Sequence, residues 1–264
     1  MTQTQFSSGA EVRRDMVLAT DLDGTFLGGS DADRKRLYAW LRDMAPDVRL
    51  IFVTGRDPAF IADLCRDGFV PTPEYVIGDV GTTIARVVTA PGKVAIEPIT
   101  ALEAEISATW ADCGDRARAL LRDTPGMWEQ SVPFRYRLSY QYDATFRPET
   151  VDRVRELGVD VLISHGCFVD ILPKGISKGP SLLRLLGHLS IPQDTVLVAG
   201  DTLNDLSMFQ TGLHGAVVGG AEAELLAATK DLPRALHCTA IGAAGIIEAI
   251  HAHNLHPTPP EIYA

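Results

Sequence analysis

Short apolar runs alternate with amphipathic stretches along the first third of the chain. The runs at residues 16–20, 48–53 and 75–77 are almost continuously apolar, which is typical of strands covered on both faces of a parallel sheet. Residues 31–43 and the stretch after Pro58 carry apolar side chains on one face, as helices packed on a sheet do. The order strand, helix, strand, helix, strand predicts an α/β fold with a Rossmann-like, doubly wound parallel sheet.

Residues with capping chemistry mark both helix starts. Ser30 precedes the first helix, and Asp57 precedes the second, where Pro58 occupies the first turn. A Ser or Asp side chain accepts a hydrogen bond from a first-turn N–H group, and proline suits that turn because it has no N–H to satisfy. Local sequence therefore predicts helices that begin at residues 31 and 58.

The pattern changes in the middle of the chain. Residues 134–142 alternate between aromatic or apolar side chains and polar ones, which predicts a half-exposed antiparallel strand. Two more strands are expected at 159–164 and 167–172, with His165 in the turn between them. We therefore predict an inserted α+β cap domain. The expected boundaries are a catalytic core of residues 1–82 and 174–264 and a cap of residues 83–173.

After the insert the buried-strand pattern returns and completes the core. The expected elements are a helix from Ser177 or Lys178 to about Leu189, strands at 195–199 and 215–218, and helices at 204–209, 221–229 and 242–253.

Composition and charge exclude several classes of protein. The 264 residues are 46% hydrophobic and carry a net charge of -10, so we expect no binding to nucleic acid or to an anionic membrane. Residues 1–14 lack the apolar stretch of a signal peptide, and no apolar run is long enough to cross a bilayer. The four cysteines form no Cys-x-x-Cys pair. We expect a cytoplasmic protein, and the sequence leaves its oligomeric state open.

Four short polar motifs follow predicted strands or begin predicted helices. Ligands bind at the carboxyl ends of strands in an open parallel sheet, so the motifs are expected to meet in one crevice. Each motif alone also occurs in ordinary turns and helix caps, but their joint occurrence favours phosphoryl-transfer chemistry. The motifs are Asp21-Leu22-Asp23-Gly24-Thr25, Thr54-Gly55-Arg56, Lys178-Gly179 and Gly200-Asp201-Thr202-Leu203-Asn204-Asp205.

The crevice would hold several carboxylates, from Asp21, Asp23, Asp201 and Asp205. Uncompensated carboxylates repel and raise one another's pKa, whereas a hard divalent cation prefers such oxygen ligands. Mg²⁺ keeps several waters and binds few carboxylates together with a substrate phosphate. We therefore predict an Mg²⁺ cofactor beside a bound phosphate.

The remaining motif residues suit the phosphate itself. Thr54 offers a hydroxyl donor, and Lys178 offers a positive charge. Gly24 and Gly55 allow backbone N–H groups to approach phosphate oxygens closely.

The spacing Asp-x-Asp allows the two carboxylates to take different chemical roles. The first carboxylate, Asp21, can attack phosphorus and become an acyl phosphate. The second, Asp23, can give a proton to the leaving oxygen and then take one from the attacking water. This pair of roles predicts a two-step hydrolysis.

Together the motifs resemble those of the haloacid dehalogenase superfamily of phosphohydrolases over nearly the whole chain, and the place of the insert resembles the type IIB capped subclass. The resemblance implies that Asp21 is the nucleophile and Asp23 the general acid and base. It implies that Thr54 and Lys178 hold the phosphate. The implied Mg²⁺ ligands are Asp21, the backbone carbonyl of Asp23, Asp201 and Asp205, the last directly or through water. The expected phosphate- and substrate-binding residues of the core are Gly24, Thr25, Gly55, Arg56 and Asn204.

A narrower resemblance is to sucrose-phosphate and mannosylfructose-phosphate phosphatases. It rests on residues 75–82, Glu129-Gln130, residues 137–140 and residues 245–250. Arg137 stands where sucrose phosphatases often carry lysine. The resemblance implies that the substrate is a small-molecule sugar phosphate, and a phosphorylated disaccharide such as sucrose 6-phosphate or mannosylfructose phosphate is the first expectation.

The polar side of the strand expected at 134–142 offers candidate sugar contacts. Sugar hydroxyls need donors and acceptors, so we expect Gln130, Arg137 and Ser139 to contact the sugar. The alternative for these residues is a solvated sheet face.

Other functions stay open at this stage. They are a sugar phosphomutase of the same superfamily, a phosphatase for glucosylglycerate- or mannosylglycerate-type osmolyte phosphates, and a non-enzymatic sugar-phosphate sensor. The presence of both Asp21 and Asp23 speaks against the sensor, since relatives that have lost their activity usually lack one of these two residues.

Overall fold

The computed structural model of the chain describes residues 16–132, 134–164 and 166–262. The polar stretch at 1–14 and the turn position expected for His165 lie outside the described residues.

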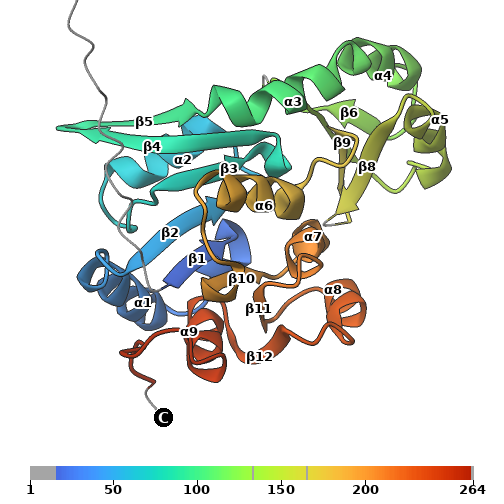
Figure 1. Cartoon of the computed structure of the whole chain (residues 1–264). Helices are drawn as coiled ribbons and strands as arrows, with labels where there is room; N and C mark the ends of the chain where they lie inside the picture. Colours follow the sequence, from blue (N-terminus) through green and yellow to red (C-terminus); the bar gives the residue numbers. More distant parts are fainter. Residues whose placement is uncertain (1–15, 133, 165, 263–264) are drawn as a thin grey trace, which may run out of the picture.

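Eight strands of the described chain form one main sheet (Figure 1). Neighbours from β12 to β3 pair in parallel, whereas β3, β4 and β5 pair antiparallel. The parallel part confirms the predicted doubly wound sheet. In spatial order the strands are β12 (Ala235–Ile241), β11 (His214–Gly219), β10 (Val196–Gly200), β1 (Met16–Thr20), β2 (Val48–Val53), β3 (Tyr75–Gly78), β4 (Thr83–Ala90) and β5 (Lys93–Pro98).

Helices cover both faces of the main sheet because successive strand side chains point in opposite directions. Met16 and Leu18 of β1 pack into one apolar cluster, and Val17 and Ala19 pack into another. The first cluster lies under α1 (Asp31–Asp43), α2 (Pro58–Arg66) and α9 (Ala243–Ala252). The second lies under α3 (Thr100–Trp110), α6 (Lys178–His188), α7 (Leu206–Phe209) and α8 (Ala223–Thr229). Short helical turns are η1 (Leu22–Phe26), η2 (Asp79–Gly81), η4 (Gln193–Thr195) and η5 (Leu203–Asp205).

Both predicted helix caps are confirmed. The Ser30 hydroxyl accepts a hydrogen bond from the N–H of Asp33 at 3.2 Å. The Asp57 carboxylate accepts from the N–H groups of Ala59 and Phe60 at 2.9 and 3.2 Å. The helices therefore begin where the local sequence supplies acceptors for their first N–H groups.

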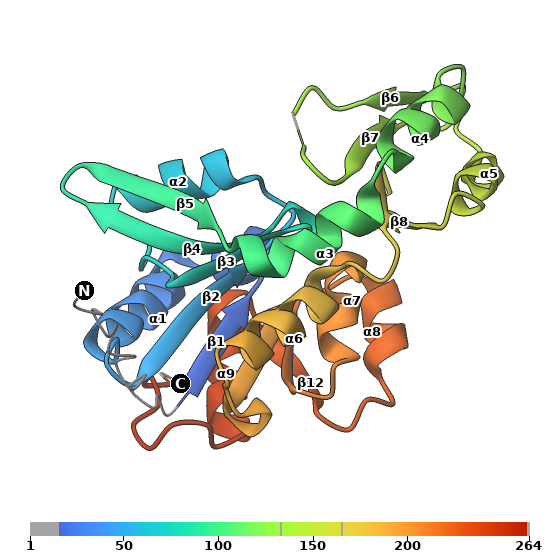
Figure 2. The same cartoon turned by 45° about the horizontal axis from the view of Figure 1, so that its top comes forward.

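A second, small sheet is antiparallel and stands beside the layers of the main sheet (Figures 1 and 2). One of its faces packs against helices through an apolar cluster that includes Leu138 and Tyr140. The strands are, in spatial order, β6 (Met127–Glu129), β7 (Leu138–Tyr142), β9 (Phe168–Pro173) and β8 (Val159–Ser164). The covering segments are α4 (Cys113–Leu121), η3 (Pro148–Val151) and α5 (Asp152–Arg155). From here on, the cap means this unit, residues 113–173.

Two expectations need correction. Residues 83–98, expected in the cap, form β4 and β5 and extend the main sheet antiparallel to β3. The strand expected at 134–142 begins only at Leu138. In the segment before it, Arg135 donates to Glu103 of α3 and Arg137 donates to the backbone carbonyl of Gly55, so both guanidinium groups make contacts outside the small sheet. The division of the chain at residues 82 and 174 otherwise stays a prediction.

The edge strands β12 and β6 were not predicted. β12 contains a register irregularity where it pairs with β11, and β6 is only 3 residues long. Their pairing depends on a neighbouring strand rather than on a strong apolar run.

Candidate active site

The predicted motifs meet at one end of the main sheet. Asp21 follows β1, Thr54 follows β2 and Asp201 follows β10, and these three strands are adjacent and parallel. Lys178 begins α6 and reaches the same place. The topology therefore gathers residues that lie far apart in the sequence.

Lys178 lies at the centre of the cluster. Its side chain is fully buried. The ammonium group donates hydrogen bonds to Asp21 Oδ1 at 2.7 Å, to Asn204 Oδ1 at 2.6 Å and to Asp205 Oδ1 at 2.6 Å. An ammonium group has three donors, and all three are used here.

Three carboxylates gather here, and two of them, Asp21 and Asp205, are bonded to this ammonium. One oxygen from each of Asp21, Asp201 and Asp205 lies within 4.8 Å of the others. The second oxygen of Asp205 accepts from the backbone N–H groups of Asp201 and Thr202, both at 3.0 Å. Three acidic groups around one cation leave an excess of negative charge. Crowded carboxylate oxygens of this kind are the donor set that a hard divalent cation prefers.

Burial and neighbouring charge control protonation in this cluster. Burial raises the pKa of Asp21 to about 8; Lys178 opposes the rise, and Asp205 and Asp201 add to it. Burial alone would lower the pKa of Lys178, but the carboxylates of Asp205 and Asp21 hold that pKa above its usual range. A divalent cation next to Asp21 would favour the charged form of its carboxyl group.

The loop after β1 fits closely against Asp201. The Thr25 hydroxyl donates to Asp201 Oδ1 at 2.7 Å. Gly24 has φ +77°, and a Cβ atom there would lie 2.1 Å from Asp201 Oδ2. Only glycine fits, so the loop holds its backbone close to the acidic cluster.

Asp23 forms an ion pair with Arg56, and both residues line the cavity that contains Asp21. The guanidinium donates to both carboxylate oxygens, at 2.8 and 2.9 Å, and about half of each side chain is exposed. The hydrogen bond to Asp23 is the main cause that raises the pKa of Arg56. Thr54 is buried, and its hydroxyl accepts a hydrogen bond from the backbone N–H of Arg56 at 3.1 Å.

The cap closes one side of the crevice. Gln130, Arg137 and Ser139 line a cavity of about 300 Å³ together with Asp21 and Asp23. The solvated-face alternative is wrong for two of these cap residues, since Arg137 is 5% exposed and Ser139 is 3% exposed. The Gln130 amide donates to the Ser139 hydroxyl at 3.0 Å.

Two carboxylates that sequence reasoning missed hold Arg137 in place. Its guanidinium donates to Asp170 at 3.1 Å and lies 3.8 Å from Asp79 Oδ1. Burial raises the pKa of Asp79, and Arg137 and Thr83 oppose that rise. Asp170 lies in a strand that the sequence predicts, but its position directly opposite Ser139 follows from the register of the small sheet, which the sequence does not show. Asp79 has φ +52°, and this left-handed conformation follows from the turn after β3.

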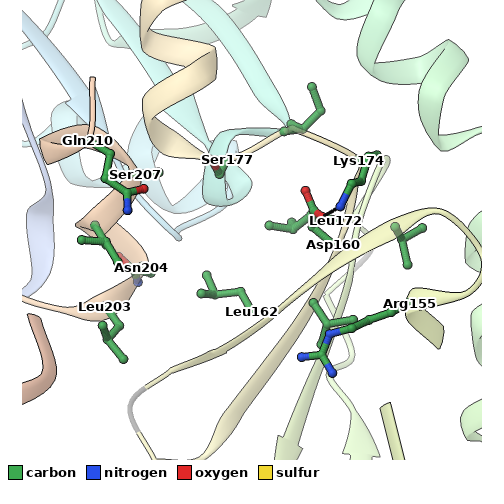
Figure 3. Close-up of a pocket in the computed structure, with 14 residues that line it drawn as sticks. Arg155, Asp160, Leu162, Leu172, Lys174, Ser177, Leu203, Asn204, Ser207 and Gln210 are labelled. Atoms are coloured by element: carbon green, nitrogen blue, oxygen red, sulfur yellow. Dashed lines mark hydrogen bonds and ion pairs between the residues drawn. The ribbon is translucent and has the colours of Figure 1, made fainter. Parts of the chain in front are cut away.

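A larger cavity, of about 420 Å³, lies between the cap and α7 (Figure 3). Its lining is mainly apolar, with Leu162 and Leu172 facing Leu203 across the gap. It shares Asn204 with the acidic cluster but contains none of the clustered carboxylates. We therefore assign the chemistry to the smaller cavity.

Two further observations concern the protein as a whole. Among the described residues, no helix has the length and apolarity needed to cross a membrane. The four cysteines form no disulfide.

Comparisons with known proteins show the family of the chain. Residues 14–254 match the family model for sucrose-6F-phosphate phosphohydrolase. The chain is 39% identical over 236 residues to a glucosylglycerol-phosphate synthase of Pseudomonas anguilliseptica. This match covers 89% of the chain but only 30% of the synthase. It is 32% identical over 251 residues to the mannosylfructose-phosphate phosphatase of Agrobacterium fabrum, covering 91% of this chain and 98% of that protein.

A solved structure shows the same architecture. The sucrose-phosphatase of Synechocystis, in complex with sucrose and phosphate, matches with a TM-score of 0.78 at 26% identity, over 91% of this chain and 98% of that one. The predicted α/β fold and the predicted superfamily are thereby confirmed. The chain belongs to the sucrose-6F-phosphate phosphohydrolase family of the haloacid dehalogenase superfamily.

Proposed function

We propose that the protein is an Mg²⁺-dependent phosphatase that transfers the phosphoryl group of a sugar phosphate to Asp21 and then to water. The observation that carries the proposal is the buried ammonium of Lys178, which bonds at once to Asp21, Asn204 and Asp205. Any buried lysine needs polar partners, but Lys178 finds its partners among clustered carboxylates at the carboxyl end of a parallel sheet, where such folds bind ligands.

The donor set fits a resident divalent cation. The carboxylates of Asp21, Asp201 and Asp205 and the backbone carbonyl of Asp23 would hold Mg²⁺. When bound, the ion would neutralise charge on the phosphoryl oxygens and keep Asp21 ionised.

In the first step an ionised oxygen of Asp21 attacks phosphorus, and the bond from phosphorus to the sugar oxygen breaks. Asp23 gives its proton to that oxygen, so the sugar leaves as a neutral alcohol. In the second step Asp23 takes a proton from water, which attacks the phosphorus of the aspartyl phosphate and releases inorganic phosphate. Lys178 and the Thr54 hydroxyl offset the charge on the transferring group.

Asp23 must exchange its partner during this cycle. Its ion pair with Arg56 is half exposed, and exposed pairs of this kind stabilise a protein by only about 0–1 kcal/mol. A substrate phosphate can therefore take over Arg56 while Asp23 turns to the leaving oxygen. This exchange gives Arg56 a role in substrate binding.

The substrate we propose first is a phosphorylated disaccharide, such as sucrose 6-phosphate or mannosylfructose phosphate. The family match and the mannosylfructose-phosphate phosphatase relative support it. In the cap, Gln130, Arg137 and Ser139 offer donors and acceptors for sugar hydroxyls.

A second candidate is a phosphorylated glucosylglycerol. It is favoured by the 39% identity to a glucosylglycerol-phosphate synthase. A cavity of about 300 Å³ is also at the small end of the range for small-molecule sites, about 300–1,000 Å³.

The unpaired cysteines fit a reducing compartment, and the cytoplasm is the location that we propose.

A phosphate-release assay tests the proposal. The purified protein with Mg²⁺ is given sucrose 6-phosphate, mannosylfructose phosphate, glucosylglycerol phosphate and monosaccharide phosphates, without any bisphosphate. We expect free phosphate and the highest kcat/KM for a phosphorylated glycoside. Turnover that appears only with a sugar bisphosphate would mark a phosphomutase and contradict the proposal.

A further inference from the structure

Trp128 differs from the other tryptophans of the chain. Trp40 and Trp110 are 8% and 7% exposed and belong to apolar clusters, whereas Trp128 is 49% exposed. Its indole N–H donates to the side-chain oxygen of Gln141 at 3.0 Å. The large ring is therefore open to solvent and yet held in one orientation.

The register of the small sheet shows which way this ring faces. Trp128 is opposite Gln141, Gln141 is opposite Phe168, and Phe168 is opposite Ser164. Residues directly opposite each other in a sheet project from the same face. The four side chains thus form one row across the small sheet, with the indole at its outer end on β6.

That face is the one directed at the catalytic cavity. Phe168 and Ser164 line the cavity together with Asp21. So does Ser139, which is two residues before Gln141 and therefore on the same face. The opposite face of the small sheet is covered by α4 and α5. Trp128 consequently extends the lined surface outward from the position of the phosphoryl group.

The chemistry of this row suits a carbohydrate. The flat, weakly polar faces of a sugar ring pack well on aromatic rings, and aromatic side chains combine a large apolar area with a polar edge. An amide such as that of Gln141 both donates and accepts, as sugar hydroxyls require. A single exposed apolar residue is common on protein surfaces. A ring fixed by a hydrogen bond, in line with cavity-lining residues, is a more specific arrangement.

We propose that Trp128, with Gln141 and Phe168, forms an outer subsite that binds the unphosphorylated unit of a phosphorylated glycoside. The inference rests on the proposed function and makes it sharper, because it requires a substrate with a sugar ring beyond the phosphorylated unit. Sucrose 6-phosphate has such a ring, and fructose 6-phosphate is the same phosphorylated unit without it.

The first experiment compares these two substrates in the full chain with Mg²⁺. Trp128→Ala should lower the ratio of kcat/KM for sucrose 6-phosphate to that for fructose 6-phosphate by about ten-fold, the size expected for one lost aromatic contact. Trp128→Phe should restore most of the ratio, because phenylalanine keeps a stacking face. Phe69→Ala is the matched control: Phe69 is 57% exposed but lies just before β3, at the opposite end of that strand from Thr54 and Asp79, so the ratio should not change.

A second readout needs no turnover. Sucrose, or glucosylglycerol in a parallel titration, should change the tryptophan fluorescence of the wild type, and Trp128→Phe should abolish that change while Trp40 and Trp110 remain. An equal effect of Trp128→Ala on both substrates, or a fluorescence change that survives Trp128→Phe, would overturn the subsite. A wild type that hydrolyses neither sucrose 6-phosphate nor fructose 6-phosphate would instead contradict the proposed function. The fluorescence titration would still show whether a sugar binds at Trp128.

Discussion

Arg137 of the cap donates a hydrogen bond to the backbone carbonyl of Gly55, in the motif that follows β2, at 2.9 Å. This contact joins the cap to the loop that we propose binds phosphate. The same guanidinium is bonded to Asp170 of the cap and lies over the ring of Phe134, 3.7 Å from its centroid. Cap position and phosphate-loop position are therefore linked through one side chain.

Replacing Arg137 tests this link. Arg137→Lys keeps the charge but cannot reproduce the forked geometry, so we expect KM for the sugar phosphate to rise about ten-fold with a smaller change in kcat. Arg137→Ala should raise KM further and lower stability by roughly 3–5 kcal/mol, because buried carboxylates lose their partner. Steady-state kinetics and thermal unfolding measure both effects. An unchanged KM in both variants would remove Arg137 from the substrate-binding residues.

Asp21→Asn tests the nucleophile. An amide cannot form the acyl phosphate, so kcat should fall by at least about a thousand-fold. The fold should persist, which circular dichroism can check, because asparagine has nearly the same shape. Full phosphatase activity in this variant would refute covalent catalysis at Asp21.

Removing the metal should stop hydrolysis. Treatment with EDTA is expected to abolish phosphate release, and Mg²⁺ is expected to restore it. Asp201→Asn should increase the Mg²⁺ concentration needed for half-maximal activity by at least about ten-fold. Hydrolysis that continues at the full rate in EDTA would contradict a metal-dependent mechanism.

Asp205 should matter for stability as well as for the metal. Its carboxylate pairs with the buried Lys178 and accepts from two backbone N–H groups. Asp205→Ala should therefore cost about 3 kcal/mol of unfolding free energy, whereas Asp201→Asn, at a partly exposed position, should cost much less. Chemical denaturation of the two variants in EDTA gives the comparison, and equal losses would show that Asp205 has no special structural role.

The pH dependence of stability should report on Asp21. Its pKa is raised from 3.8 to about 8 in the folded protein, so between these values the folded state keeps a proton that the unfolded chain has lost. The contribution of this group to stability therefore falls as the pH rises from about 4 to about 8. In EDTA, the Tm of the wild type should decline across this range relative to that of Asp21→Asn. Mg²⁺ should reduce the difference between the two proteins. Tm curves that run parallel in EDTA would show that the protonation of Asp21 does not contribute to the pH dependence of stability.

Much of the core could be predicted from the sequence by itself. Continuous apolar runs identified β1, β2, β3, β10 and β11, and local hydrogen bonding to Ser30 and Asp57 fixed two helix starts. The residues that the structure gathers around Lys178 were also named beforehand, because each follows a buried strand or begins a helix. Signals of this kind are local, so they can be interpreted without knowledge of the tertiary structure.

Only the tertiary structure decided the rest. Residues 83–98 extend the main sheet, the segment before Leu138 is not a strand, and Arg137 is buried between Asp79 and Asp170. Which strand an edge segment pairs with, and whether a charged side chain is buried, depend on groups that are distant in the sequence. Arg137 is separated from Gly55 by 82 positions, and the free energy of burying its charge is offset only when both carboxylates and that carbonyl are in place.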